Sequence, residues 1–92
     1  MKAIYKVPNG KLLKVSLERD NNNNIQFVKI TGDFFTYPEE NIEHLEKYLI
    51  GATLSPEALK ESIEDFLRRS PTEFFGLDVE SLIHTIMAAA QQ

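Results

Sequence analysis

A strict alternation of apolar and polar side chains in residues 13–18 is the feature that most constrains the fold of this 92-residue chain. Three apolar side chains alternate with three polar ones: Leu13, Val15 and Leu17 with Lys14, Ser16 and Glu18. Neighbouring side chains of a strand point to opposite faces, so one face of this strand is apolar and the other is polar. The pattern is typical of an antiparallel sheet that is covered on one side only.

Two more strands are predicted around this one. Residues 7–10 (Val-Pro-Asn-Gly) are typical of a turn, so that residues 3–7 and 11–18 form a hairpin. After the second strand, residues 19–24 include four consecutive asparagines and predict an exposed loop.

The third predicted strand covers residues 25–31, and its alternation is less regular. Val28 and Ile30 should face one way, and Ile25 and Phe27 the other. Apolar residues on both faces would be explained by a β-bulge or by apolar cover on both sides near Phe27.

A first helix is predicted over residues 38–50, after the strand has ended. Proline is favoured at the first helical position, which Pro38 would occupy. Glu39 and Glu40 would lie in the first turn, where the helix dipole favours negative charge. Gly51 would supply the C-terminal cap.

Two later helices are predicted from their capping residues. Ser55, followed by proline, begins a helix that ends at Arg69. Residues 70–73 repeat the start signal and predict a short turn or a single helical turn through residues 74–75. The last helix is expected over residues 78–90. Strands followed by helices predict one α+β domain over residues 1–92, with a three-stranded antiparallel sheet and about three helices packed on one of its faces.

Composition excludes several classes of chemistry. The chain has no cysteine, so disulfides, thiolate metal sites and cysteine nucleophiles are excluded. His44 and His84 lie forty positions apart without metal-ligand spacing, and no bound metal is expected. The acidic pairs on the helices, Glu46 included, are interpreted as a solvated face. Without an apolar run of membrane length or a signal sequence, the expected location is the cytoplasm and no membrane contact is expected.

Charge is spread unevenly along the chain. Residues 1–31 hold six cations and two anions, whereas residues 32–92 hold four cations and twelve anions. Such a dipolar surface suits docking on a partner. Lys11 and Lys14 are either solvated lysines near a turn or project toward an anionic partner or nucleotide. A basic sheet surface for nucleic acid is the less favoured alternative, because the sequence pI is about 5.1.

Residues 31–40 contain the most suggestive candidate site. Asp33 would cap a turn and Gly32 would permit close backbone approach. Phe34 and Phe35 are adjacent, so they cannot both point the same way in extended backbone, and one should be buried while the other is exposed. The same reasoning applies to the two phenylalanines at residues 74–75. Core and interface roles both stay open for these aromatic pairs.

Three segments together carry a resemblance to a known family. They are the hairpin at residues 6–15 (Lys-Val-Pro-Asn-Gly-Lys-Leu-Leu-Lys-Val), the strand at residues 28–35 (Val-Lys-Ile-Thr-Gly-Asp-Phe-Phe), and Pro-Glu-Glu at residues 38–40 followed by Leu-Glu at residues 45–46. The pattern, over about residues 5–51, resembles the small C-terminal domain of lipoate–protein ligases. It is most similar to the form in which that domain is a separate small subunit of a bipartite ligase.

The resemblance implies a non-catalytic accessory subunit that forms a heterodimer with a large catalytic subunit. Ligases of this kind use ATP to activate lipoate as lipoyl-AMP and then acylate a lysine of a lipoyl carrier domain. The complex would use ATP, Mg and lipoate, with none bound by this chain alone. The implied fold is shared with SufE/NifU-type proteins, whose activity depends on cysteine and is therefore not expected here.

The residues expected to order the partner or its nucleotide site are Gly10, Lys11, Lys14, Gly32, Asp33, Phe34 and Phe35, with a helix-start motif at Pro38, Glu39 and Glu40. No activity is expected from this chain by itself. The alternative is a stand-alone protein-interaction or adaptor module with no ligase partner.

Overall fold

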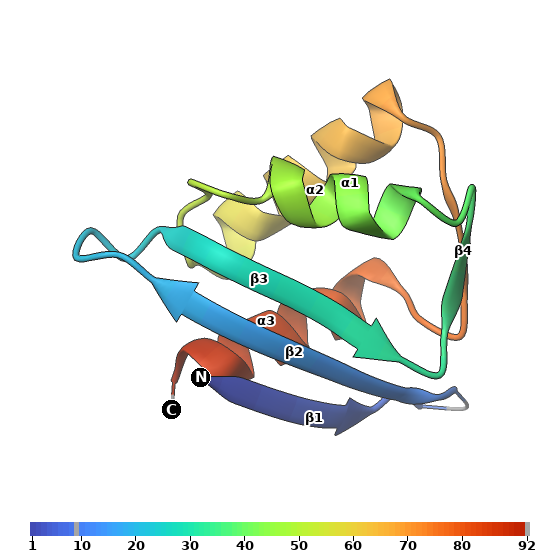
Figure 1. Ribbon diagram of the computed structural model, residues 1–92, viewed down its shortest axis with the longest axis horizontal. Helices are drawn as coiled ribbons and strands as arrows, with labels where there is room; N and C mark the ends of the chain where they lie inside the picture. The colour runs from blue at the N-terminus through green and yellow to red at the C-terminus, as the bar shows by residue number, and fades with distance from the viewer. Residues whose placement is uncertain (9, 92) are drawn as a thin grey trace.

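The computed structural model describes every residue except Asn9 and Gln92 (Figure 1). In these described residues, five strands and three helices follow one another in the order β1 (Lys2–Lys6), β2 (Leu12–Arg19), β3 (Ile25–Gly32), β4 (Phe35–Tyr37), α1 (Asn41–Tyr48), α2 (Pro56–Arg69), β5 (Glu73–Phe75) and α3 (Val79–Ala90). The predicted order of strands followed by helices is confirmed, except that β5 lies between the last two helices.

The first three strands form one antiparallel sheet in the order β1-β2-β3. Val15 of β2 lies opposite Ala3 of β1 and Ile30 of β3, and all three are buried. Leu13 and Leu17 are also buried on this face, as their alternation predicts. The turn at residues 7–10 closes the hairpin with a hydrogen bond from Gly10 N–H to Val7 O (2.8 Å), although its third residue is outside the described part of the chain.

A β-bulge interrupts β3, which is one of the two explanations that the irregular alternation left open. Glu18 lies opposite Phe27, whereas Arg19 lies opposite Ile25, so Gln26 is the extra residue. The extra residue turns Ile25 onto the buried face, while Phe27 remains 45% exposed on the other. The expectation that these two residues share a face was wrong, because the bulge shifts the alternation by one position.

All three helices lie on the buried face of the sheet. Helix α3 packs on β1 and β2, α1 packs on β3, and α2 rests against α1 and α3. Figure 1 shows α3 passing behind the sheet and α1 and α2 above it. The predicted beginnings of α2 and α3 are confirmed, since Ser55 Oγ accepts from Ala58 N–H (3.2 Å) and Asp78 Oδ1 from Ser81 N–H (2.7 Å). The predicted α+β class with one covered face is confirmed. In the described residues, none of these helices combines the length and the apolarity that crossing a membrane requires.

Helix α1 is shorter than predicted at its N-terminus. Pro38 is not the first helical residue, because residues 38–40 form a turn in which Asn41 N–H donates to Pro38 O (3.1 Å). The buried Thr36 hydroxyl lies within hydrogen-bond distance of the Pro38 and Glu39 carbonyls, and so holds this turn. Gly51 has a φ of +89° but gives its N–H to Ile25 O (2.7 Å), so it reverses the chain without capping the helix itself.

The helical turn predicted through residues 74–75 was wrong. These residues belong to β5, which pairs antiparallel with β4. In Figure 1 β4 stands at the end of the main sheet beside the segment that returns from α2. The start signal at residues 70–73 is local, whereas the pairing with β4 joins segments that are far apart in sequence and is decided by the fold.

Candidate functional site

Strands β4 and β5 form a two-stranded ribbon, and its outer face is aromatic. Phe35 lies opposite Phe75, and their rings stack with centroids 4.6 Å apart and planes 11° apart. Phe35 is 59% exposed, Phe75 39% and Tyr37 68%. We call these three side chains the aromatic strip. Exposed aromatic side chains that are already held in place are typical anchors of protein–protein interfaces.

The first phenylalanine of each adjacent pair points inward. Phe34 and Phe74 are partly buried and pack against the core cluster. Each adjacent pair therefore divides into one inward and one exposed ring, as the geometry of extended backbone predicted.

Gly32 and Asp33 join the main sheet to the ribbon. Gly32 has a φ of +149°, and a Cβ there would lie 2.2 Å from Leu12 O, so no larger residue fits without backbone movement. Asp33 N–H donates to the same carbonyl (3.0 Å) and closes the end of the strand through its backbone. The predicted close approach at Gly32 is therefore found in the structure.

The hairpin turn meets the ribbon at this corner. A Cβ on Gly76, which follows β5, would lie 3.1 Å from Lys11 Cγ and 3.4 Å from Phe34 Cα. A Cβ on Gly10 would lie 3.3 Å from Gly76 O. The structure thus brings six of the predicted site residues to one corner of the molecule: Gly10, Lys11, Gly32, Asp33, Phe34 and Phe35.

The remaining predicted residues lie elsewhere. Lys14 is exposed on the uncovered face of the sheet, opposite Thr31, and is not part of the corner. Pro38, Glu39 and Glu40 follow the far end of β4 and precede α1. Glu39 nevertheless lines a hollow of about 290 Å³ together with Phe34 and Phe35.

Two contributors to the aromatic strip were not predicted as site residues. Tyr37 follows Phe35 by two positions, with the buried Thr36 between them, and this spacing is the signal of a strand with an aromatic face. Phe75 belonged to the predicted helical turn. Its place beside Phe35 depends on a strand pairing that no local pattern indicates.

Glu46 is a buried carboxylate and not part of a solvated face. Its side chain accepts from Ile30 N–H (2.7 Å) and lies 3.8 Å from Lys29 Nζ. The Ile30 N–H lies on the outer edge of the sheet, where no further strand can accept its hydrogen bond. Glu46 accepts it instead. This corrects the interpretation of Glu46 alone, because the other helical glutamates of that interpretation are exposed, and it gives the Leu-Glu motif at residues 45–46 a structural role.

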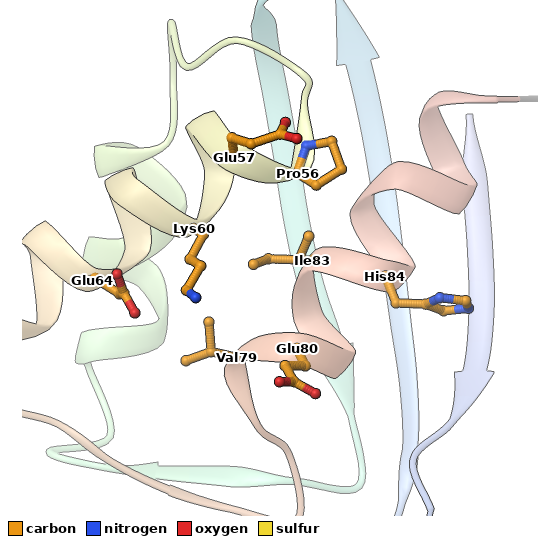
Figure 2. Close-up of a pocket in the computed structure, with 8 residues that line it drawn as sticks. All are labelled: Pro56, Glu57, Lys60, Glu64, Val79, Glu80, Ile83 and His84. Atoms are coloured by element: carbon orange, nitrogen blue, oxygen red, sulfur yellow. The ribbon is translucent and has the colours of Figure 1, made fainter.

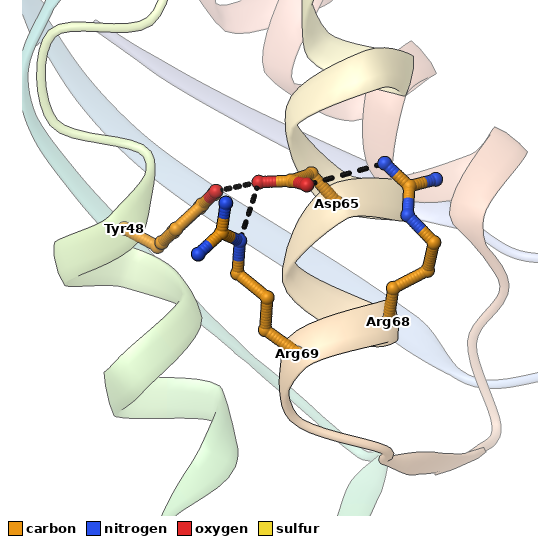
Figure 3. A network of polar contacts seen from close by, with 4 residues as sticks. All are labelled: Tyr48, Asp65, Arg68 and Arg69. Atoms are coloured by element: carbon orange, nitrogen blue, oxygen red, sulfur yellow. Dashed lines mark hydrogen bonds and ion pairs between the residues drawn. The ribbon is translucent and has the colours of Figure 1, made fainter.

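A polar network joins α1 to α2 on the surface (Figure 3). The Asp65 carboxylate accepts from the Tyr48 hydroxyl, from Arg69 Nε (3.0 Å) and from Arg68 Nη2 (3.1 Å). The Tyr48 hydrogen bond, with help from the two guanidinium groups, lowers the pKa of Asp65, and the same hydrogen bond raises the pKa of Tyr48. Asp65 of α2 thus bonds Tyr48 of α1 and two arginines of its own helix, so the network links the two helices.

A groove of about 560 Å³ lies between α2 and α3 (Figure 2). Lys60, Val79 and Ile83 point toward its interior, whereas the His84 ring is turned away toward Tyr5, with ring centroids 4.4 Å apart. His44 lies on α1, with Nδ1 3.3 Å from Asn41 Oδ1. Among the described residues no three His, Asp or Glu side chains converge as metal ligands would.

Comparison with known proteins places the chain in a family. The model of the bacterial lipoate protein ligase C-terminus matches residues 6–86. The chain therefore belongs to the family of lipoate–protein ligase C-terminal domains, and the resemblance inferred from the hairpin, strand and helix motifs is confirmed.

A relative and a solved structure agree with this family. The chain is 40% identical over 55 residues to lipoate-protein ligase A subunit 2 of Thermoplasma acidophilum, and the match covers 60% of this chain and about half (55%) of that relative. It also resembles a chain in the structure of an archaeal lipoylation system, a bi-partite lipoate protein ligase and its E2 lipoyl domain from Thermoplasma acidophilum. That match has a TM-score of 0.74 and 30% identity, and covers 94% of this chain and 97% of the other.

Proposed function

We propose that this chain is the non-catalytic small subunit of a two-chain lipoate–protein ligase. It acts with a large catalytic subunit in the ATP-dependent activation of lipoate to lipoyl-AMP, before transfer to a lysine of a carrier domain. One observation carries the proposal: almost the whole chain superposes on almost the whole of one chain from a bi-partite ligase structure (94% and 97%). The match thus extends over nearly all of that chain of the bi-partite ligase.

The division of chemistry between the two subunits follows from the residues available. In the described part of this chain, no three His, Asp or Glu side chains lie close enough together to hold a metal ion. The proposal therefore assigns the Mg²⁺ ligands, ATP and lipoate to the large subunit. This chain contributes shape and charge, and the complex acts in the cytoplasm.

The aromatic strip is the proposed anchor on the large subunit. Its rings are exposed but held by strand pairing and by the Phe35–Phe75 stack, so docking them costs little side-chain entropy. Lys11 lies at the same corner, exposed and beside Gly76, where it can add positive charge close to a nucleotide site in the partner. Docking of this corner would order the large subunit for the activation step.

A reconstitution experiment tests the proposal. The chain is co-expressed with a ligase large subunit that lacks a C-terminal domain, and lipoate-dependent pyrophosphate exchange is measured for each subunit and for the pair. We expect a one-to-one complex, and activation only when both subunits are present. Phe35→Ser should weaken the complex by about tenfold or more, because it removes a central aromatic anchor.

A matched control is Tyr48→Ser, which also removes an exposed aromatic ring but lies on α1, away from the corner. It should leave affinity for the large subunit within about twofold, as expected for a residue outside the interface. If the two subunits form no complex, the proposal fails. A complex that forms without any gain in lipoyl-AMP formation would favour the adaptor function instead.

A further inference from the structure

The face of the main sheet that the helices leave uncovered is rich in lysine. It consists of the even-numbered residues of β1 and β2 together with Phe27, Lys29 and Thr31 of β3, and we call it the open face. It carries four lysines and one glutamate, for a charge of +3, whereas the whole chain carries −4. The rest of the molecule therefore carries −7, and the open face is a basic surface on an acidic protein.

Apolar side chains are exposed among these lysines. Ile4 is 66% exposed and lies opposite Lys14, and Leu12 is 42% exposed and lies opposite Lys6. The two apolar residues are diagonal neighbours on adjacent strands, close enough to form one patch. Phe27 adds a ring, 45% exposed, toward the other end of the face. An apolar patch bordered by cations has the composition of a protein docking surface, with a buried centre and a charged rim.

The open face is continuous with the corner that carries the aromatic strip. Leu12 belongs to the open face, and its carbonyl oxygen accepts the Asp33 N–H where the ribbon begins. Lys6, opposite Leu12, lies at the same end of the sheet. One partner could therefore contact the aromatic strip and the open face together.

We propose that the open face docks on an acidic surface of the large subunit, with Ile4 and Leu12 as apolar contacts and Lys6 and Lys14 as charge contacts. This inference rests on the proposed function and extends its interface beyond the aromatic strip. Opposite charge on the two surfaces would steer association and fix the orientation of the subunits. Nucleic acid suits the face less well, because the exposed centre is aliphatic and the rest of the chain repels a polyanion.

Charge reversal tests this inference against a matched control. The double variant Lys6→Glu/Lys14→Glu changes the open face, while Lys47→Glu/Lys60→Glu makes the same change in net charge on α1 and α2. Affinity and association rate for the purified large subunit are measured for both at ~0.05 M and ~0.5 M salt. We expect the open-face variant to raise Kd about tenfold or more at low salt, mainly through slower association, and less at high salt, where charges are screened.

The control variant should change Kd by about twofold or less, since its charges lie outside the proposed interface. If both variants weaken binding equally, net charge alone acts and the inference is overturned. An unchanged Kd for the open-face variant also overturns it, but leaves the proposed function standing. If even the unmodified chain fails to bind the large subunit, the proposed function and this inference both fail.

Two further measurements keep the test decisive. Should the charge-reversed strand fail to fold, Lys6→Ala/Lys14→Ala replaces it, with an expected rise in Kd of about threefold at low salt. Ile4→Ser should speed dissociation at both salt concentrations, because it removes an apolar contact that salt does not screen. A single-stranded RNA oligonucleotide is the competing probe. Binding of RNA that Lys6→Glu/Lys14→Glu abolishes, with an unchanged affinity for the large subunit, would overturn the inference.

Discussion

The main sheet and its three helices, together called the body, bury most of their large apolar side chains, whereas the β4–β5 ribbon exposes most of its aromatic ones to solvent. In the sheet and helices, Leu13, Ile63 and Leu82 are completely buried. In the ribbon, Phe35 and Tyr37 are more than half exposed, although they belong to a regular strand pair. A pair of three-residue strands buries too little surface to be stable alone, so the ribbon depends on the larger body for its shape.

This difference separates stability from recognition. Burial of apolar surface in the body supplies the free energy of folding, while the ribbon holds aromatic rings in water, where a partner can cover them. The two regions meet at Gly32, Asp33 and Gly76, and mutations on either side of that junction should have different effects. Four predictions test the separation, in order of decreasing expected effect on stability.

The largest effect should come from truncating the core of the body. Leu82→Ala removes a side chain that is 0% exposed and should lower the free energy of unfolding by about 2–5 kcal/mol. Phe35→Ala removes a ring that is 59% exposed and should cost at most about 1.5 kcal/mol, chiefly its stack on Phe75. Urea unfolding of both variants measures the contrast. Equal losses would mean that the ribbon is an integral part of the core.

The junction itself should be the next most sensitive. In Gly32→Ala the new Cβ would lie 2.2 Å from Leu12 O, at a φ of +149°, so the backbone must move. We expect a loss of roughly 2–4 kcal/mol, from backbone strain and from movement of the neighbouring strand. The matched variant Gly51→Ala has a φ of +89° but open space around it, and should cost only about 1–2 kcal/mol.

Thermal and urea unfolding of the two glycine variants provide the comparison. If Gly51→Ala is the more damaging of the two, close approach at the junction is not what selects glycine at residue 32. If Gly32→Ala folds fully but no longer binds the large subunit, the junction is needed for binding and not for stability.

At the outer edge of the sheet, Glu46→Ala should cost about 1–3 kcal/mol. The buried carboxylate accepts the Ile30 N–H at 2.7 Å, and its removal leaves that donor without its partner. Glu43→Ala on the same helix changes an exposed side chain and should be nearly neutral. Amide hydrogen exchange at Ile30 is the direct measurement. Unchanged protection in Glu46→Ala would show that the edge is satisfied without the carboxylate.

The smallest effect should appear in the pH dependence of stability. The pKa of Asp65 is lowered from 3.8, first by the Tyr48 hydrogen bond, so ionisation of Asp65 favours the folded state. That contribution is present above pH 3.8 and is lost as the pH falls through the lower pKa of the folded protein. The raised pKa of Tyr48 acts in the opposite sense, with a contribution present below pH 10.0 and lost as the pH rises further.

Melting temperatures of Asp65→Asn and of the unmodified chain, measured from pH 7 to pH 2, test this link between helices. The variant should melt slightly lower at pH 7, and the difference should disappear in the acid range, because both proteins then lack the carboxylate charge. Glu64→Gln, at the exposed neighbouring position, is the control and should melt like the unmodified chain throughout. A constant difference at every pH would mean that the Asp65 charge contributes nothing.

Much of the body could be predicted from local patterns. The alternation in residues 13–18 places the second strand and its buried face, and the caps at Ser55 and Asp78 locate the beginnings of α2 and α3. The irregular alternation near Phe27 indicated either a bulge or apolar cover on both faces, and the structure has the bulge. Each of these features depends on side chains a few positions apart, so a short stretch of sequence is enough to predict it.

The ribbon and the sheet edge could be predicted only in part. Adjacent phenylalanines had to point in opposite directions, but nothing local indicates that Phe75 would stack on Phe35, forty residues away. A three-residue strand is too short to show periodicity, and the capping signal at residues 70–73 favoured a helix instead. Glu46 was interpreted as solvated, because its hydrogen-bond partner, the Ile30 N–H, belongs to another element and leaves no local signal in the sequence.

By itself, the sequence determined the three strands of the main sheet, its covered face, the beginnings of α2 and α3, and the family motifs in residues 6–46. These follow from side-chain alternation, capping chemistry and backbone restrictions, all of which act over a few residues. Only the tertiary structure decided the β4–β5 pairing, the corner where Lys11 meets Gly76, and the burial of Glu46. Contacts between distant segments depend on how the whole chain packs, because the two residues of each contact become neighbours only when the sheet and helices have folded.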